Sequence, residues 1–199
     1  MSRSARGHLL VGTAGRQLFK LDERKLGTPL EQRESPLKFQ TRAVACVPGT
    51  SPASDAYAAA SIEGRVAIEY GDAAHGTSYA FKCHRQGSTI YPVNALCFNP
   101  VYGTFASGGA DGCVYVWDAK AKKRLASFTV PTSVAALDFS ADGTLLAMAS
   151  SYTFEEGEKA DVPPDEVYVR QCLKYEVAPK NWQDPPGAGG AAAGAGEAS

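Results

Sequence analysis

The chain has 199 residues, enough for one domain of ordinary size, and 44% of them are hydrophobic, which suffices for a real core. Its formal net charge of −1 provides no overall attraction to nucleic acid or to an anionic membrane. No apolar run is long enough to span a bilayer, and residues 1–7 lack a signal-peptide pattern. We therefore expect a soluble protein of the cytoplasm or nucleus that contacts neither nucleic acid nor membrane directly.

The cysteines also indicate a reducing, intracellular environment. They are odd in number, scattered along the chain and without C-x-x-C spacing, and we expect them to be reduced and mostly buried. The five are Cys46, Cys83, Cys97, Cys113 and Cys172.

Short strand patterns begin near the N-terminus. Residues 1–6 carry no such pattern, and we expect an unstructured leader there. Residues 8–14 are apolar, residues 17–22 alternate in polarity, and a looser polar segment leads to residues 37–42. This first unit, residues 7–40, therefore predicts three strands of a four-stranded sheet whose first strand is absent.

A second unit covers residues 41–85 and has four strand patterns. An inner-strand pattern at residues 41–48 is followed by patterns at residues 57–61, 65–70 and 79–85. Each of the two central patterns is short and bounded by turn residues, as expected for strands linked by hairpins.

The third unit, residues 92–130, has the most informative sequence. Residues 93–98 predict an inner strand, and the turn at residues 110–112 contains Gly112, which can adopt the positive φ of a tight hairpin. The alternating segment after it ends in Trp117-Asp118. A Trp-Asp pair that ends the third of four short strands is the signature of a WD repeat.

A fourth unit, residues 131–174, lacks its last strand. Strand patterns at residues 133–140, 144–150 and 166–172 are interrupted by a polar loop at residues 151–165. Beyond residue 174 the pattern fades, and we expect residues 175–199, rich in Gly and Ala towards their end, to be a disordered tail.

The spacing of the units predicts a β-propeller. Gly15, Gly64 and Gly112 recur at intervals of 49 and 48 residues, and each precedes a similar strand. Periods of this size are typical of propeller blades. We therefore predict an all-β, incomplete WD-repeat β-propeller with about fourteen strands in four blades.

Five stretches of the sequence carry a family resemblance: residues 37–42, 61–67, 81–85, 91–94 and 122–125. They resemble the budding-uninhibited-by-benzimidazole family, the WD-repeat proteins of the spindle assembly checkpoint. The similarity extends from about Leu9 to about Gln171. Two of these stretches, residues 61–67 and 81–85, are shared with a sister family, the messenger RNA export propeller of the nuclear pore. The other three favour the checkpoint family.

The resemblance implies the C-terminal half of a seven-bladed propeller without catalytic activity. Its top face would bind the GLEBS motif of the checkpoint kinase and of its pseudokinase-like relative. The same face would recognise phosphorylated Met-Glu-Leu-Thr repeats of the kinetochore scaffold, and the protein would reside in the nucleus and at kinetochores, and also in the cytoplasm. Because three blades are absent, the chain would be a partial gene model, a short isoform or one half of an assembly. Two open blade edges could otherwise leave it inactive and prone to aggregation.

Basic residues at strand ends and beside turns are candidates for peptide binding. Arginine suits bidentate contact with phosphate, whereas isolated surface charges are often merely solvated. The resemblance favours a binding role for Arg65, Lys82 and Arg85 and leaves Lys38 and Arg42 open. Tyr91 lies near a loop where it could contact a peptide. The candidates are Lys38, Arg42, Arg65, Lys82, Arg85 and Tyr91.

His84 is the only histidine in a patterned strand. In WD repeats such a histidine often hydrogen-bonds the turn aspartate, and a Ser or Thr and the Trp complete the chain. That structural network would comprise His84, Ser107, Asp111 and Trp117. Contact of His84 with a peptide is the alternative. The gap between His84 and Val93 is longer than the corresponding gap in the usual WD repeat.

No group of residues indicates catalysis, a metal or a cofactor. The Gly-rich segment at residues 108–112 lacks both the P-loop and the dinucleotide-binding patterns and is expected to be a hairpin. The acidic segment at residues 155–158 is most simply a solvated insertion, with a binding role as the alternative. We expect no enzyme, because no paired carboxylates, activated nucleophile or ligand cluster is apparent.

Overall fold

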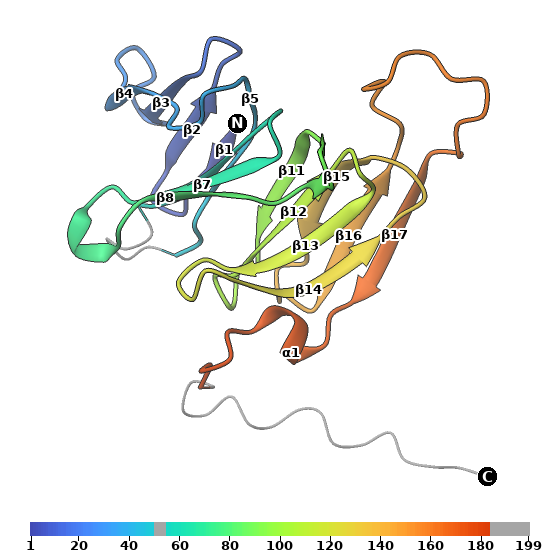
Figure 1. Ribbon diagram of the computed structural model, residues 1–199. Helices are drawn as coiled ribbons and strands as arrows, with labels where there is room; N and C mark the ends of the chain where they lie inside the picture. Colours follow the sequence, from blue (N-terminus) through green and yellow to red (C-terminus); the bar gives the residue numbers. More distant parts are fainter. Residues whose placement is uncertain (50–54, 184–199) are drawn as a thin grey trace.

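The computed structural model describes residues 1–49 and 55–183 and contains four consecutive antiparallel blades (Figure 1). Blades 1 and 2 are four-stranded sheets in sequence order. Blade 1 comprises β1 (Ser2–Arg3), β2 (His8–Gly12), β3 (Gln17–Asp22) and β4 (Glu31–Glu34). Blade 2 comprises β5 (Thr41–Cys46), β6 (Tyr57–Ser61), β7 (Arg65–Glu69) and β8 (Tyr79–Lys82).

Blade 3 is four-stranded and blade 4 three-stranded, again in sequence order. Blade 3 comprises β11 (Val93–Phe98), β12 (Phe105–Gly109), β13 (Cys113–Asp118) and β14 (Lys123–Thr129). Blade 4 comprises β15 (Val134–Phe139), β16 (Leu145–Ser150) and β17 (Glu166–Gln171). The all-β propeller fold is confirmed, and the blades form no closed ring within the part of the chain that the structure describes.

Apolar residues between neighbouring blades form the core. The inner strands β5, β11 and β15 pack in succession, so each blade faces the next. The side chains of Ala58, Ala59 and Ala60 in β6 are completely buried, and their small size allows blades 1 and 3 to approach blade 2 closely. Between blades 3 and 4, Val116 and Leu146 lie in a larger cluster. On the outer side of β17, Val167 and Val169 are 70% and 65% exposed.

The expected unstructured leader at residues 1–6 is wrong, and so is the missing first strand of blade 1. Ser2 and Arg3 pair with Leu10 and Leu9, so β1 supplies that strand. The Arg3 guanidinium also donates to the Glu23 carboxylate at 2.6 Å. A strand of two residues satisfies the otherwise unpaired inner edge of β2, but it is too short to show any polarity period.

Three further expectations need correction. The last strand of the first unit was expected at residues 37–42, but it is β4 (Glu31–Glu34), which pairs with β3 within the segment expected to be loose and polar. The strand predicted for residues 79–85 ends at Lys82, and the chain then forms a small hairpin of β9 (Arg85–Gln86) and β10 (Thr89–Ile90). The expected disordered tail is wrong over its first residues, because helix α1 (Lys174–Val177) packs beside β14. Val177 is 1% exposed, and its carbonyl accepts a hydrogen bond from Thr104 Oγ1 at 2.5 Å. Residues 184–199 of the predicted tail lie outside the described residues.

A buried chain of side chains joins blade 2 to blade 3. His84 and Asp111 are both fully buried, and His84 Nδ1 lies 2.8 Å from Asp111 Oδ1. His84 Nε2 lies 2.9 Å from Ser107 Oγ, and Trp117 Nε1 donates to the same oxygen at 2.9 Å. Because the carboxylate can only accept, the imidazole proton is placed on Nδ1, and Nε2 accepts the Ser107 hydroxyl proton. The four residues thus connect in the order expected from the sequence.

This chain of side chains holds the loop after β8 against the β12–β13 hairpin. The Asp111 carboxylate also accepts the Cys113 N–H at 3.2 Å, which fixes the turn itself. The His84 and Tyr115 rings pack with their centroids 4.8 Å apart. A Cβ atom at Gly109 would lie only 2.2 Å from His84 Nδ1, so the close approach of the imidazole requires glycine.

The substitution Ser107→Ala should destabilise the protein by about 2–4 kcal/mol, because it deprives both His84 Nε2 and Trp117 Nε1 of their partner. Ser127 in β14 of the same blade is exposed. Its change to alanine should alter the free energy of unfolding by less than about 0.5 kcal/mol. Urea unfolding monitored by tryptophan fluorescence measures the change in the free energy of unfolding for both substitutions. Equal effects of the two substitutions would show that the buried chain of hydrogen bonds does not stabilise the fold.

Substitution of two glycines by alanine should separate backbone strain from crowding. Gly103 and Gly112 have φ of +65° and +70°, but only Gly112 would place its Cβ near backbone oxygen atoms, 2.8 Å from Val130 O. We expect Gly103→Ala to cost about 1–2 kcal/mol and Gly112→Ala to cost roughly 1–3 kcal/mol more. Equal losses in chemical denaturation would contradict the crowding at the hairpin.

Candidate functional site

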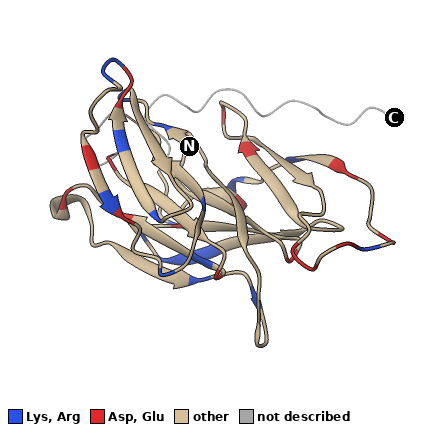
Figure 2. Cartoon of the chain, turned by 90° about the horizontal axis from the view of Figure 1, so that it is seen from above, with Lys and Arg blue, Asp and Glu red and all other residues tan. Residues whose placement is uncertain are grey.

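All predicted peptide-binding residues lie at one end of the blades, which we call the hairpin face. It consists of the hairpin turns and the loops between blades, at residues 13–16, 35–40, 62–64, 83–92, 110–112, 130–133 and 151–165. Basic and acidic residues intermix over the molecule, so charge alone does not single out one face (Figure 2). The local arrangement of the charges therefore decides which part of this face can bind a ligand.

Three of the predicted cations gather at the β6–β7 hairpin. Arg65 begins β7 and lies opposite Lys82 in β8. Arg85 Nη2 donates to the Glu63 carbonyl at 3.1 Å, and Arg65 Nε lies 3.4 Å from the Glu63 carboxylate. The Lys82 side chain is exposed, whereas both arginines are partly buried. We call Arg65, Lys82 and Arg85 the basic cluster; Glu63 is the acidic residue with which it interacts.

The remaining candidates are placed elsewhere on the same face. Lys38 is exposed, and its carbonyl accepts from Arg16 Nη1 at 2.5 Å. Arg42 is exposed on the inner strand β5, where Nε donates to Asn94 Oδ1 at 3.1 Å. Tyr91 is partly buried, and its N–H donates to the His84 carbonyl at 3.1 Å. The structure thus brings together three of the six candidates and distributes the other three around them.

Sequence reasoning missed Asn94, which connects three blades. Its Oδ1 accepts from Arg42 of blade 2, and its Nδ2 donates to the Val134 carbonyl of blade 4 at 3.2 Å. Nδ2 also lies 3.4 Å from Thr153 Oγ1. A single polar residue directly after Val93 in an apolar inner strand was the available signal. Asn94 positions Arg42 at the inner edge of the hairpin face.

The cysteine next to His84 does not form an activated nucleophile. Cys83 Sγ lies 3.4 Å from the Gly64 carbonyl oxygen, and burial raises the pKa of the thiol to about 12. The His84 imidazole is engaged by Asp111 and Ser107. The thiol therefore stays protonated near neutral pH and lacks an available base.

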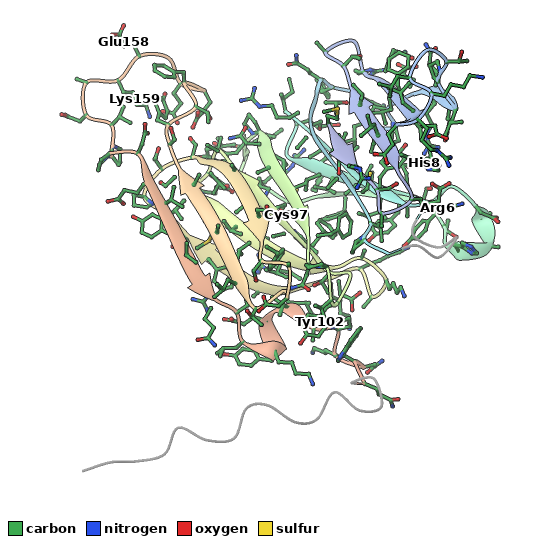
Figure 3. All side chains as sticks on the ribbon, turned by 180° about the vertical axis from the view of Figure 1, so that it is seen from behind. Arg6, His8, Cys97, Tyr102, Glu158 and Lys159 are labelled. Carbon is green, nitrogen blue, oxygen red and sulfur yellow. The ribbon has the colours of Figure 1, made fainter. Side chains whose placement is uncertain are left out.

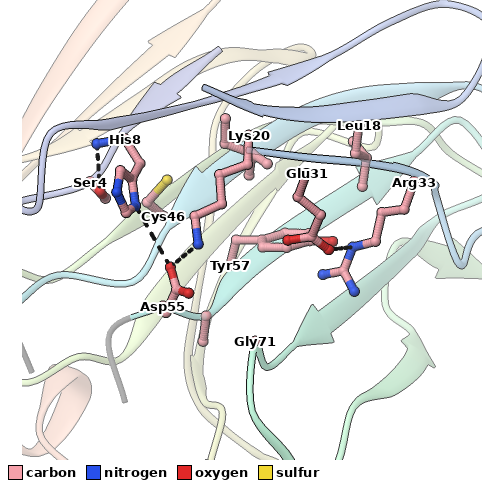
Figure 4. A pocket seen from close by; sticks show the side chains of 12 residues that line it. Ser4, His8, Leu18, Lys20, Glu31, Arg33, Cys46, Asp55, Tyr57 and Gly71 are labelled. Atoms are coloured by element: carbon pink, nitrogen blue, oxygen red, sulfur yellow. Dashed lines mark hydrogen bonds and ion pairs between the residues drawn. The ribbon is translucent and has the colours of Figure 1, made fainter. Parts of the chain in front are cut away.

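A small cavity between blades 1 and 2 contains ionisable groups (Figure 4). The Lys20 ammonium pairs with the Asp55 carboxylate, and His8 Nδ1 lies 3.9 Å from the same carboxylate. The cavity volume is about 30 Å³, which accommodates about one or two water molecules. Such a cavity is too small for an organic substrate. Over residues 1–49 and 55–183 no group of three metal-ligating side chains converges.

No helix within the described ranges is both long and apolar enough to cross a bilayer.

Comparison with known proteins places the chain among WD-repeat proteins. The WD domain, G-beta repeat family matches residues 77–118, which include the Trp117-Asp118 pair. The β-propeller domain of Cps50 (Swd1) from Myceliophteria thermophila superimposes with a TM-score of 0.57 at 14% identity, covering 84% of this chain and 56% of that chain. At that identity the likeness concerns the fold alone.

Similarity to curated proteins is higher. The chain is 51% identical to mitotic checkpoint protein BUB3.1 of Arabidopsis thaliana, covering 90% of this chain and 54% of that protein. It is 46% identical to mitotic checkpoint protein bub3 of Dictyostelium discoideum, covering 85% of this chain and 52% of that protein. Protein RAE1 of Arabidopsis thaliana, from the sister family, is 37% identical, covering 78% of this chain and 44% of that protein.

The chain therefore spans about half the length of these relatives. The resemblance seen in the sequence is confirmed, because the propeller fold, the Trp-Asp repeat and the sequence identities all support it. The chain is a WD-repeat β-propeller protein that is similar, over about half of their length, to the mitotic checkpoint proteins of the budding-uninhibited-by-benzimidazole family.

Proposed function

We propose that the chain is a non-enzymatic protein-binding scaffold of the mitotic spindle checkpoint. Its hairpin face would bind GLEBS motifs of the checkpoint kinase and its relative, and phosphorylated repeats of the kinetochore scaffold. It would act in the nucleus and at kinetochores, and would also occur in the cytoplasm. The names of the relatives at 51% and 46% identity support the checkpoint assignment.

The observation that carries the binding proposal is the basic cluster. Three cations converge at the β6–β7 hairpin, and Glu63 is the carboxylate that the structure places against Arg65. Two guanidinium groups and an ammonium suit an acidic or phosphorylated peptide, because charge-assisted hydrogen bonds to carboxylate and phosphate are strong. Both arginine Nε atoms are buried, and Arg65 Nε lies 3.4 Å from the Glu63 carboxylate. The exposed Lys82 ammonium and the accessible parts of the two partly buried arginine side chains would therefore meet the ligand.

The hairpin face also offers a rigid support for recognition. Arg85 follows directly after His84, whose imidazole is fixed from both ring nitrogens. Lys82 and Arg65 lie opposite each other in a regular antiparallel pair. The Arg65 and Arg85 side chains are also held by Glu63, so these two lose less side-chain entropy than a free cation when they bind a ligand.

The second candidate function is that of a messenger RNA export propeller which binds a nucleoporin GLEBS motif. The identity of 35% to mRNA export factor GLE2 of Chaetomium thermophilum favours it, although the identities to the checkpoint proteins are higher. A pull-down with the two GLEBS peptides in competition separates the candidates. Preferential retention of the nucleoporin peptide would contradict the checkpoint assignment.

The substitution Arg65→Glu should weaken binding of a checkpoint-kinase GLEBS peptide, and of a phosphothreonine peptide, by at least about tenfold, because it places a like charge beside the ligand. Isothermal titration calorimetry measures the affinity. The matched control is Lys25→Glu, which makes the same charge change at the exposed β3–β4 turn on the opposite end of blade 1. An equal loss with the control would show that only net charge matters.

A further inference from the structure

A large groove lies at the end of the blades opposite the hairpin face. It is formed by the loop after β5, the β11–β12 and β13–β14 turns, and the segment that follows helix α1. Its volume is about 920 Å³, near the upper end of the range of about 300–1,000 Å³ for ligand sites. Figure 3 shows Tyr102, which lines the groove, beside helix α1 and at the other end of the blades from Glu158 and Lys159. We call this site the opposite groove.

The lining of the opposite groove contains an aromatic pair. The Tyr102 and Trp182 rings pack edge to face with their centroids 4.9 Å apart. Val101 in the β11–β12 turn is 45% exposed, and Leu125 of β14 also lines the groove. Accessible apolar side chains that are gathered in a concave site and bordered by charged groups are typical of protein interaction sites.

Hydrogen bonds fix the segments that form the opposite groove. In the β11–β12 turn, Asn99 Oδ1 accepts the Tyr102 N–H at 3.1 Å. The buried Thr104 Oγ1 donates to the Val177 carbonyl at 2.5 Å, which ties helix α1 and the segment after it to the same turn. A ligand that enters the groove therefore meets walls that need little ordering, and the entropic cost of binding is reduced.

The charge of the opposite groove is unbalanced. Lys120, Lys123 and Lys180 line it and are exposed, and no carboxylate within residues 1–49 and 55–183 pairs with them. Asp118 is the single acidic residue among the described residues of the lining. It is 7% exposed, and its Oδ1 accepts the N–H groups of Lys120 and Ala121, both at 2.9 Å. Three ammonium groups are therefore available to an anionic ligand, whereas the carboxylate is engaged by the backbone of its own turn.

We propose that the opposite groove binds an acidic segment of a second protein partner, with an apolar side chain of that segment packed against the Tyr102–Trp182 pair. Carboxylates beside the apolar residue pair with the lysines, so the segment uses both the charge and the aromatic lining. The net charge of −1 and a groove with three cations disfavour nucleic acid, whose interfaces are broadly basic. The inference goes beyond the proposed function, because the basic cluster lies at the other end of the blades. Occupation of both ends lets one chain link two protein partners.

NMR titration of the ¹⁵N-labelled 199-residue chain with the synthetic peptide acetyl-Glu-Glu-Phe-Pro-Glu-Glu-amide tests the groove directly. The amide signals of Gly103 and Ala121 and the indole signal of Trp182 should shift. The indole signal of Trp117, whose N–H donates to Ser107, should stay unchanged. Two control peptides, one with Gln for every Glu and one with Ser for Phe and Pro, should each bind at least about fivefold more weakly. Equal binding of either control peptide would overturn the proposal.

The double substitution Lys120→Gln and Lys180→Gln should weaken binding of the Glu peptide by about three- to tenfold, because it removes two of the three cations. The matched control is Arg6→Gln with Lys25→Gln, which removes two exposed cations that do not line the groove. It should change the affinity by less than about twofold, because distant exposed charges are screened. Equal losses in the two double variants would contradict the proposal, since the attraction would then depend on net charge alone.

Other occupants of the groove would give different results in the same titration. Shifts confined to residues 62–65 and 83–91 would place the acidic peptide on the basic cluster and overturn the proposal. No shift at the groove would also overturn it, and would favour residues 184–199 of this chain or a second copy as the occupant. Equal shifts with hexathymidylate would contradict it as well, because the groove would then accept any polyanion.

Discussion

The hydrogen-bonded chain from Asp111 through His84 and Ser107 to Trp117 is the interaction on which the hairpin face depends. It buries an imidazole and a carboxylate between two blades, and these groups are tolerated there only because each has a partner. The loop that carries Arg85 and Tyr91 follows His84 directly. The position of the predicted binding residues is therefore set by a buried polar network as well as by sheet packing.

Charge is divided between two positions on the same face. The basic cluster lies at the β6–β7 hairpin of blade 2, whereas Glu155, Glu156 and Asp161 lie in the long loop between β16 and β17 of blade 4. The Asp111 carboxylate is fully buried; its Oδ1 holds His84, and its Oδ2 has no donor among the described residues. A net charge of −1 for the whole chain conceals this separation. Separated charges of opposite sign favour one orientation of a bound peptide over the reverse.

Most of the fold could be predicted from the sequence because each blade repeats a long, regular signal. The intervals between Gly15, Gly64 and Gly112, and the Trp117-Asp118 pair, indicated hairpin-linked strands and placed His84 near Asp111. Elements of a few residues escaped prediction. Strand β1 and helix α1 are too short to show a period. The partner of helix α1 is also distant in sequence, since Thr104 and Val177 are 73 residues apart.

The candidate site was less predictable. The sequence supplied the identity of Arg65, Lys82 and Arg85, but their convergence around Glu63 depends on strand register and on loop geometry. The bridging role of Asn94 and the unpaired oxygen of Asp111 depend on contacts between blades. A polarity pattern can mark Asn94 as unusual within its strand, but it does not identify the partners in other blades. The acidic segment at residues 155–158, expected to be a solvated insertion, contributes two carboxylates to a cavity lined also by another blade.

The central claim is that partners are recognised on the hairpin face, and amide hydrogen exchange in the presence of a GLEBS peptide tests it most directly. Bound peptide should slow exchange at residues 62–65 and 83–91 and leave the opposite turns at residues 22–25 and 118–122 unchanged. Slower exchange confined to those opposite turns would contradict the account, because it would place the partner at the other end of the blades.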